Sequence, residues 1–243
     1  MEYKLLEWTD EKVQRYWNYI SQFPEHYFTY QVGGNLAKLI KKYTRRNDTL
    51  LDYGSGPGFL IKYLLENKLE VSALEFSTDS LQRIKKSYEG KEGFNGAYSI
   101  EELNKKNIKF NIITLIEVIE HLDDHNLDLT FNNIHRLLEP EGYLIITTPN
   151  NEDLSKSYIC CPETNELFHH WQHIRSWNIE TLGPFLKKMG FTVHVLKETN
   201  FNIGPLSEKL HYPIQVLKES IRGKKSGKDK PHLCCICSPN IKR

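Results

Sequence analysis

The residues with the clearest capacity for chemistry lie in a glycine-rich loop. The run Asp52-Tyr53-Gly54-Ser55-Gly56-Pro57-Gly58 follows a short apolar segment and precedes a segment with helical spacing. Glycines let the backbone turn sharply and come close to a ligand, and N–H groups at the start of a helix bind polar or anionic groups. Glu75 lies 19 residues after Gly56, at the predicted end of the next strand, where a carboxylate could accept hydrogen bonds from both hydroxyls of a ribose. The loop and Glu75 predict a site for a ribose-bearing cofactor.

A second group of reactive side chains follows the isoleucine-rich segment Phe110 to Ile116. Glu117, Glu120 and His121 would lie on one face if residues 117–122 formed a helical turn. Two carboxylates and an imidazole could then hold a divalent cation. Without a cation, an imidazole with an ordinary pKa of about 6.5 could accept the proton of an attacking hydroxyl.

Alternating strands and helices must position these groups. The repeating pattern begins near Asp48 and predicts a doubly wound α/β fold, with a parallel sheet covered by helices on both faces. Because open α/β sheets bind ligands at the carboxyl ends of their strands, both groups of side chains should meet at one edge. Strands are predicted at 49–53, 69–74, 96–99, 110–116, 143–148, 191–196 and 232–238, and helices at 59–67, 80–88, 127–138 and 178–189.

The remaining segments are expected to belong to the same domain, which would span residues 1–243. Residues 1–47 carry two amphipathic stretches, 10–19 and 34–43, and predict a helical cap over the core at 48–243. Residues 150–177 and 200–231 interrupt the repeat and are predicted to be insertions. Within the second insertion, the polar and basic run 219–229 is expected to form a solvated loop.

Composition narrows the possible partners and the cellular location. The chain has 243 residues, 39% of them hydrophobic, and a net charge of +1, so no strong overall field favours nucleic acid or an acidic membrane. No apolar run is long enough to span a bilayer, and the N-terminus lacks the features of a secretory leader. Five cysteines, some of them adjacent, do not resemble a disulfide framework. Cys161 is expected in the core and the cysteines at 234–237 in a buried last strand, and the chain is expected to be cytoplasmic.

The glycine loop resembles motif I of class I S-adenosylmethionine-dependent methyltransferases, (D/E)-x-G-x-G-x-G, at all four fixed positions. Phe59 argues against the dinucleotide fingerprint, which requires a glycine or alanine at that point. The resemblance implies a seven-stranded Rossmann-like sheet whose last strand is antiparallel, and S-adenosylmethionine as cofactor. The cofactor-binding residues that it implies are Asp52, Tyr53, Gly54, Ser55, Gly56, Gly58, Glu75, Phe76, Ile116 and Glu117.

The Glu-x-x-Glu-His group resembles that of the ubiquinone-biosynthesis O-methyltransferases and of the small-RNA 3′-end 2′-O-methyltransferases. In the latter family two glutamates and two histidines hold a divalent cation, and the second histidine precedes an aromatic residue by four positions, as His173 precedes Trp177 here. The resemblance implies that Glu117, Glu120, His121 and His173 bind one Mg²⁺, Mn²⁺, Fe²⁺ or Zn²⁺. Two alternatives remain: His121 and His173 as metal-free catalytic residues, or a turn that only shapes the cofactor pocket.

The acceptor is predicted more coarsely than the cofactor. The insertions are rich in aromatic residues and histidines, which suit a flat or sugar-like molecule, and no appended RNA-binding domain is present in the 243 residues. The predicted function is O-methylation of a small-molecule, glycan or lipid-linked hydroxyl, without a nucleic-acid partner. The alternatives are methylation of an RNA ribose 2′-hydroxyl and a non-catalytic cofactor-binding homologue.

Overall fold

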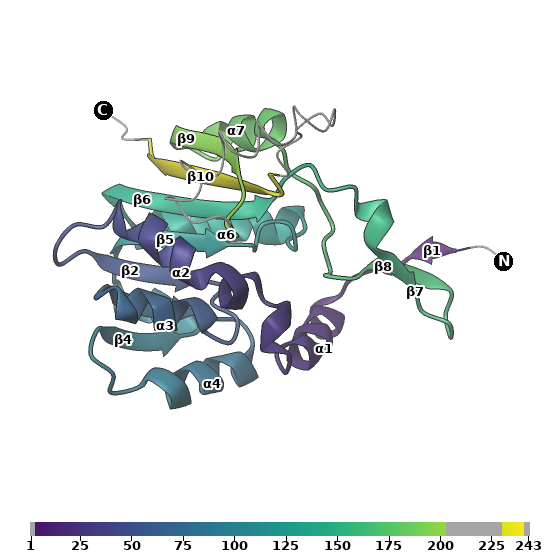
Figure 1. Ribbon diagram of the computed structural model, residues 1–243, viewed down its shortest axis with the longest axis horizontal. Coiled ribbons are helices and arrows are strands. Elements are labelled where there is room, and N and C mark those ends of the chain that lie inside the picture. Colours follow the sequence, from purple (N-terminus) through teal and green to yellow (C-terminus); the bar gives the residue numbers. More distant parts are fainter. Residues whose placement is uncertain (1–2, 203–229, 241–243) are drawn as a thin grey trace, which may run out of the picture.

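A central sheet organises the protein, as the computed structural model shows (Figure 1). The structure describes residues 3–202 and 230–240. Within them, seven strands form one sheet in the order β4-β3-β2-β5-β6-β10-β9, in which β10 is antiparallel to both of its neighbours and the pairs from β4 to β6 are parallel. The predicted doubly wound sheet with an antiparallel last strand is confirmed. The strands are β2 (Thr49–Tyr53), β3 (Glu70–Leu74), β4 (Phe94–Tyr98), β5 (Phe110–Ile116), β6 (Leu138–Pro149), β9 (Phe191–Thr199) and β10 (His232–Pro239).

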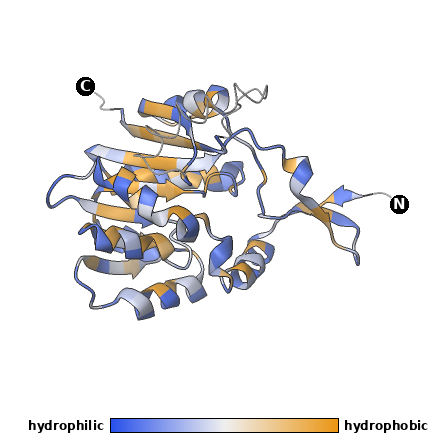
Figure 2. Ribbon diagram, in the orientation of Figure 1, coloured by the Kyte–Doolittle hydropathy of each residue, from blue (hydrophilic) through white to orange (hydrophobic). Residues whose placement is uncertain are grey.

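Helices cover both faces of the sheet because successive strand residues point to opposite sides. Leu50 and Ile112 pack with one group of helices, whereas Leu51 and Ile113 pack with the other. The hydropathy colouring shows the apolar residues concentrated along the central strands (Figure 2). The first group of helices is α2 (Phe28–Lys41), α3 (Phe59–Glu66) and α4 (Thr78–Tyr88), and the second is α5 (Ile100–Lys106), α6 (Asp124–Leu137) and α7 (Ile179–Lys188).

The N-terminal region contributes directly to the core. Helix α2 begins at Phe28, six residues before the predicted start, and its Leu36, Ala37 and Ile40 are completely buried. A Cβ atom on Gly33 would come within 2.3 Å of the Tyr63 ring on α3, so the two helices cross at a point where only glycine fits. By contrast, α1 (Asp10–Ile20) and the short helix η1 (Pro24–His26) lie beyond the carboxyl ends of the parallel strands (Figure 1).

One helix and the start of one strand also differ from the sequence prediction. Helix α5 was not predicted, although Ser99 and Glu102 form a capping box, which is a signal readable from sequence. Strand β6 starts at Leu138, the last residue of the predicted helix 127–138 and five residues before the predicted strand 143–148, because Phe110 pairs with Leu138 and Ile112 already pairs with Tyr143. The intervening residues 139–142 therefore form an irregularity within the strand.

A second, small sheet is built largely by the insertion at 150–177. In the described residues it has the order β1-β8-β7, with β1 (Lys4–Leu5) parallel and β7 (Tyr158–Cys160) antiparallel to β8 (Glu166–His169). The helix η2 (Leu154–Ser157) precedes it, and the sheet stands apart from the main sheet beside α1 (Figure 1).

The five cysteines differ in burial. Cys161 is only half-buried, so its expected place in the core is wrong, whereas the three cysteines of β10 are buried as expected. The run 219–229, predicted to be a loop, lies outside the described residues. Among the described residues, no helix is long and apolar enough to cross a membrane.

Candidate functional site

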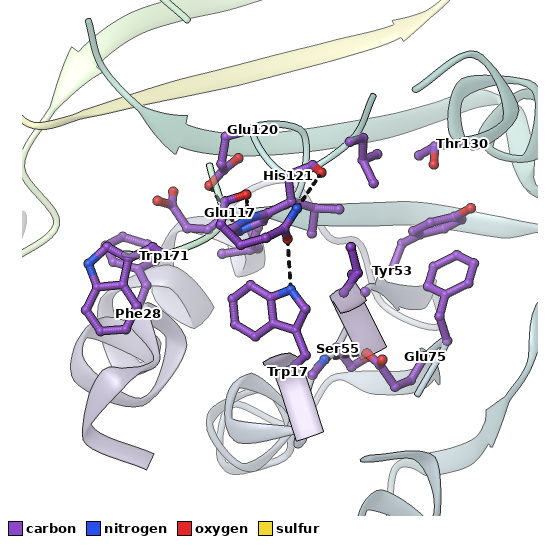
Figure 3. Close-up of a pocket in the computed structure, with 18 of the residues that line it drawn as sticks. Trp17, Phe28, Tyr53, Ser55, Glu75, Glu117, Glu120, His121, Thr130 and Trp171 are labelled. Atoms are coloured by element: carbon purple, nitrogen blue, oxygen red, sulfur yellow. Dashed lines mark hydrogen bonds and ion pairs between the residues drawn. The ribbon is translucent and has the colours of Figure 1, made fainter. Parts of the chain in front are cut away.

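A cavity of about 1340 Å³ opens at the carboxyl ends of the parallel strands. The segments that follow β2, β3, β5 and β6 line it, together with residues of α1 and of the 169–173 loop. Figure 3 shows Glu117, Glu120 and His121 gathered in one part of its wall and Ser55 with Glu75 in another. Both groups of side chains singled out in the sequence therefore meet in one cavity.

The glycine loop turns away from β2 through left-handed backbone conformations. Gly54 and Gly56 have φ angles of +74° and +54°, which favour glycine. The N–H groups of Gly54 and Ser55 both donate to the carbonyl oxygen of Leu74, at 2.9 and 3.1 Å, which ties the loop to the end of β3. The loop thus presents its backbone, rather than side chains, to the cavity.

Gly58 has a different role from the other residues predicted to bind the cofactor. It does not line the cavity: it lies just before α3 with φ +84°, and an added Cβ would lie 3.0 Å from Ile84 and 3.1 Å from Ile61. It therefore permits close packing of α3 against α4. The other nine line the cavity: Asp52, Tyr53, Gly54, Ser55, Gly56, Glu75, Phe76, Ile116 and Glu117.

Two carboxyl groups beside the loop are held where the charged form is disfavoured. Glu75 accepts hydrogen bonds from the N–H groups of Gly56 (2.7 Å) and Ser77 (2.9 Å), yet burial raises its pKa to about 7. Asp52 accepts a hydrogen bond from the Thr114 hydroxyl at 2.8 Å, and burial raises its pKa to about 6. A positively charged ligand in this cavity would stabilise both carboxylates.

The expected helical turn at 117–122 is absent. Glu117 has φ +51°, and its N–H donates to the carbonyl of Thr147 at 2.9 Å, so it continues the pairing of β5 with β6. Its Oε2 lies 3.3 Å from Nδ1 of His232, the first residue of β10. Glu117 is consequently held at the sheet edge and does not share a helical face with Glu120.

Three of the four predicted cation ligands nevertheless come together. Glu120, His121 and His173 each offer one ligand atom within 4.8 Å of the other two, and Glu117 is not part of this group. Oε1 of Glu120 is buried and has no hydrogen-bond partner among the described residues, whereas Oε2 accepts from the Thr148 hydroxyl at 2.9 Å. The unsatisfied oxygen fits a positively charged or hydrogen-bond-donating ligand.

The same burial acts in opposite directions on the glutamate and the histidine. It raises the pKa of Glu120 well above its usual range, with help from the neighbouring Glu117 charge. Burial, together with the nearby His173, lowers the pKa of His121 to about 3. His121 is therefore a neutral imidazole at physiological pH.

Contacts from distant segments hold His121 and His173 in place. Nδ1 of His121 lies 3.4 Å from the carbonyl oxygen of Gln172, and Nδ1 of His173 lies 2.5 Å from Oε2 of Glu152. The indole of Trp17, on α1, meets the His121 ring edge-on at 5.0 Å between centroids and donates to Oε1 of Gln172 at 3.0 Å. Trp177, by contrast, is buried against Phe185 and has a packing role.

Several residues of this site were missed by the sequence analysis. Glu152, Gln172 and His232 contact predicted site residues, and His169 contacts Glu152 at 3.2 Å. The segment 169–173 contains three histidines, but the spacing to Trp177 points to His173 alone and gives no signal for His169. Glu152 carries no local signal, because its role depends on a loop after β6 meeting the end of β8.

Known proteins resemble the chain both in sequence and in fold. A family model described as "Methyltransferase domain" matches residues 24–196. The ubiquinone biosynthesis O-methyltransferase of Pelagibacter ubique is 26% identical over 65% of this chain and 67% of its own length. The enzyme of the same name from Coxiella burnetii is 30% identical over 47% of this chain. That match spans about half (49%) of the length of the Coxiella burnetii enzyme.

Solved structures share the fold at low sequence identity. The Burkholderia thailandensis 1,6-didemethyltoxoflavin-N1-methyltransferase, with bound 1,6-didemethyltoxoflavin and S-adenosylhomocysteine, superimposes with a TM-score of 0.66 at 15% identity, covering 97% of this chain and 92% of that chain. A Clostridium acetobutylicum S-adenosylmethionine-dependent methyltransferase gives a TM-score of 0.61 at 14% identity, covering 94% and 99%. Together with the glycine loop and the strand order, these matches show that the chain belongs to the class I S-adenosylmethionine-dependent methyltransferases.

Proposed function

We propose that this methyltransferase methylates a hydroxyl group of a small, uncharged acceptor held beside Glu120, His121 and His173. The observation that carries the proposal is that these three side chains and the glycine loop line the same cavity. The O-methyltransferase names of the sequence relatives support oxygen as the atom methylated.

The cofactor would lie across the ends of β2, β3 and β5. When bound, S-adenosylmethionine supplies an electrophilic methyl group on a positively charged sulfur. Glu75 would exchange its two backbone N–H partners for the ribose hydroxyls, and the Gly54–Gly56 backbone would pass beneath the methionine part. Phe76, which is 58% exposed at the cavity edge, offers an aromatic face for the adenine. Asp52, at the base of the loop, would stabilise positive charge.

Glu120, His121 and His173 fit a divalent cation, although Glu117 does not join them. The set offers one buried oxygen without a partner and two imidazoles whose Nδ1 atoms face oxygen atoms, which leaves each Nε2 available. A bound cation would lower the pKa of a coordinated hydroxyl and hold two adjacent acceptor oxygens. Mixed carboxylate and imidazole ligands suit Mg²⁺, Mn²⁺, Fe²⁺ or Zn²⁺.

A cation-free site is the second candidate, and the structure distinguishes the two histidines in it. Because the pKa of His121 is lowered to about 3, this imidazole is a weak proton acceptor at neutral pH. His173, whose Nδ1 is held by Glu152, would then take the hydroxyl proton on Nε2. Glu120 and His121 would orient the acceptor.

The charges of the cavity favour an uncharged acceptor over RNA. Among the described residues, no lysine or arginine lines the cavity, whereas nucleic-acid sites depend on such residues to neutralise phosphates. A catechol or a sugar is uncharged and offers two neighbouring hydroxyls, so either kind of acceptor suits this cavity. The carboxylates in the lining are Asp10, Glu11, Asp52, Glu75, Glu117, Glu120 and Glu152.

The deciding experiment measures methylation of a catechol and vicinal-diol panel before and after removal of metal with a chelator. We expect activity to disappear on chelation and to return with Mn²⁺ or Mg²⁺, and His173→Ala to lose turnover while retaining S-adenosylmethionine binding. His125→Ala, on the exposed face of α6, is the matched control. Activity that survives chelation but not His173→Ala would select the cation-free mechanism. Full activity of His173→Ala would overturn both, and S-adenosylmethionine binding without methylation of any acceptor would indicate a non-catalytic cofactor-binding homologue.

A further inference from the structure

Glu152 lies between two histidines that come from a different part of the chain. It follows β6, and its Oε1 lies 3.2 Å from Nε2 of His169, at the end of β8, while its Oε2 lies 2.5 Å from Nδ1 of His173. The two imidazoles are stacked, with centroids 4.5 Å apart and planes at 16°. Glu152 therefore places one oxygen beside each ring: the contact with His173 is an aligned hydrogen bond, whereas the contact with His169 is close but not aligned as one.

The backbone determines which nitrogen of His169 carries the proton. Nδ1 of His169 accepts hydrogen bonds from the N–H groups of Trp171, at 3.1 Å, and His173, at 3.2 Å. A nitrogen that accepts cannot also carry a hydrogen, so a neutral His169 must be protonated on Nε2, the atom that faces Glu152. The side chain of His169 is completely buried, so no water competes for this arrangement.

The proton position on His173 follows from the same reasoning. An ionised carboxylate only accepts hydrogen bonds, so Oε2 of Glu152 requires a proton on Nδ1 of His173. The lone pair then remains on Nε2, the nitrogen available to the group formed with Glu120 and His121. Free histidine favours the opposite tautomer, so Glu152 imposes this state.

We propose that Glu152, itself oriented by His169, is a positioning residue that keeps the Nε2 lone pair of His173 available to the reacting group. The inference rests on the proposed function, in which that lone pair meets either a divalent cation or the proton of the acceptor hydroxyl. In this role Glu152, which also lines the cavity, acts through His173.

Substitution of Glu152 by glutamine makes a sharp prediction, because an amide has one accepting and one donating end. His169 is held as a donor by the backbone, so the amide oxygen must face His169 and the amide NH₂ must face Nδ1 of His173. His173 then has to accept on Nδ1 and move its proton to Nε2. Glu152→Gln should therefore reverse the tautomer of His173 and leave that of His169 unchanged.

The test records histidine nitrogen–proton correlation spectra of the cation-free protein at mildly alkaline pH. We expect an Nδ1–H His173 in the wild type and in Glu152→Asp, and an Nε2–H His173 in Glu152→Gln. Calorimetric titration with Mn²⁺ alone should show affinity about tenfold to a hundredfold weaker in Glu152→Gln, with partial recovery in Glu152→Asp. S-adenosylmethionine affinity should not change in either variant. Glu163→Gln, an exposed carboxylate before β8, is the matched control.

The outcomes separate this inference from the proposed function. An Nε2–H His173 in the wild type, or an unchanged tautomer in Glu152→Gln, would overturn the positioning role. Glu152, His169 and His173 also lie within ligand distance of one another. If Glu152→Gln abolishes Mn²⁺ binding while Glu120→Gln leaves it intact, the cation lies among these three residues. Glu152 would then be a ligand rather than a positioning residue. If the tautomers are as expected and no Mn²⁺ binds, the cation is wrong and the positioning of His173 as a base stands.

Discussion

Three carboxyl groups in the cavity have pKa values that a cationic ligand would lower. Asp52, Glu75 and Glu120 all have raised pKa values, and burial is the largest cause in each case. An empty cavity therefore favours their neutral forms, whereas a positive charge nearby restores the carboxylates. S-adenosylmethionine brings such a charge on its sulfur, so cofactor binding and ionisation of these side chains should be coupled.

Glu75 allows a direct test of the cofactor assignment. Glu75→Ala should weaken S-adenosylmethionine binding by about 2–3 kcal/mol, because two charge-assisted hydrogen bonds to the ribose are lost. Calorimetric titration measures the change, and Asp79→Ala, an exposed carboxylate in the first turn of α4, serves as control. Equal affinities of wild type and Glu75→Ala would remove Glu75 from the ribose site.

Gly58 should prove to be a structural glycine rather than a cofactor-contacting one. Both Gly58 and Gly90 have positive φ angles, of +84° and +77°, but an added Cβ meets Ile84 at 3.0 Å in the first case and open space in the second. Gly58→Ala should therefore cost about 1–3 kcal/mol more stability than Gly90→Ala. Denaturant unfolding of the two variants makes the comparison, and equal losses would contradict the packing role.

The sequence could single out the glycine loop, most of which lines the cavity, because its conformation depends on local backbone geometry. The spacing Asp52 to Gly58 and the position of Glu75 after the next strand are features of neighbouring segments. His232 and Glu152 could not be found in this way. Their partners are brought together by the antiparallel position of β10 and by the meeting of β6 with the small sheet, and neither is encoded in local spacing.

At the scale of elements, α1 fixes the 169–173 loop against the turn that carries His121. Tyr16 donates to the carbonyl of His170, and Trp17 donates to the side chain of Gln172, whose own amide donates to the carbonyl of His121 at 3.2 Å. Gln172 is buried with φ +60°, a conformation that costs energy for a residue with a side chain. The helix thus positions the site from outside the main sheet.

Trp17→Phe tests this role of α1. The change keeps an aromatic ring but leaves the buried oxygen of Gln172 without its donor, which should cost about 1–3 kcal/mol of stability. It should also weaken Mn²⁺ binding, because Gln172 positions His121. Thermal unfolding and calorimetry measure the two effects. Trp8→Phe is the control, since Trp8 makes ring contacts with Tyr16 and Phe168. An equal response of the two variants would show that ring packing alone matters.

Element type was largely predictable, but the conformation at strand ends was not. Hydrophobic periodicity predicted most of the strands and helices, because their burial repeats along the sequence. The turn after β5 was wrong because Glu117 adopts a left-handed conformation and stays hydrogen-bonded to β6. Sequence spacing in Glu-x-x-Glu-His fits a helical turn equally well, so only the tertiary contact decides.

For the whole molecule, the raised pKa of Glu75 predicts how stability depends on pH without cofactor. Its pKa rises from an unfolded value of about 4.5 to about 7, so its contribution to stability is complete below the unfolded pKa and is lost as pH rises through about 7. Glu75→Gln removes this titration. The stability of the wild type relative to Glu75→Gln should therefore fall between pH 4.5 and 7, by at most about 3 kcal/mol. Denaturant unfolding across that range measures the difference, and a constant difference would contradict the raised pKa.

The charge balance of the cavity predicts which acceptors the enzyme selects. Seven carboxyl groups and, within the part of the chain that the structure describes, neither lysine nor arginine line it. At an effective dielectric constant of about 20, a unit charge about 8 Å from another contributes about 2 kcal/mol, which corresponds to more than a tenfold change in rate constant. Catechol, its aminomethyl derivative and its carboxylate derivative share the reacting hydroxyls and differ in charge. We expect kcat/KM to be at least about tenfold lower for the carboxylate derivative than for catechol, and not lower for the aminomethyl derivative.

The source of this discrimination can be tested with salt and with one substitution. Screening should reduce the difference between the catechol derivatives as ionic strength rises, because the opening of the cavity is exposed to solvent. Glu117→Gln removes a carboxylate that pairs with His232 and stands apart from the Glu120, His121 and His173 group. This variant should raise kcat/KM for the carboxylate derivative relative to catechol. If the carboxylate derivative reacts as well as catechol in the wild type, a basic group must reach the acceptor, and the cavity charges do not set the specificity.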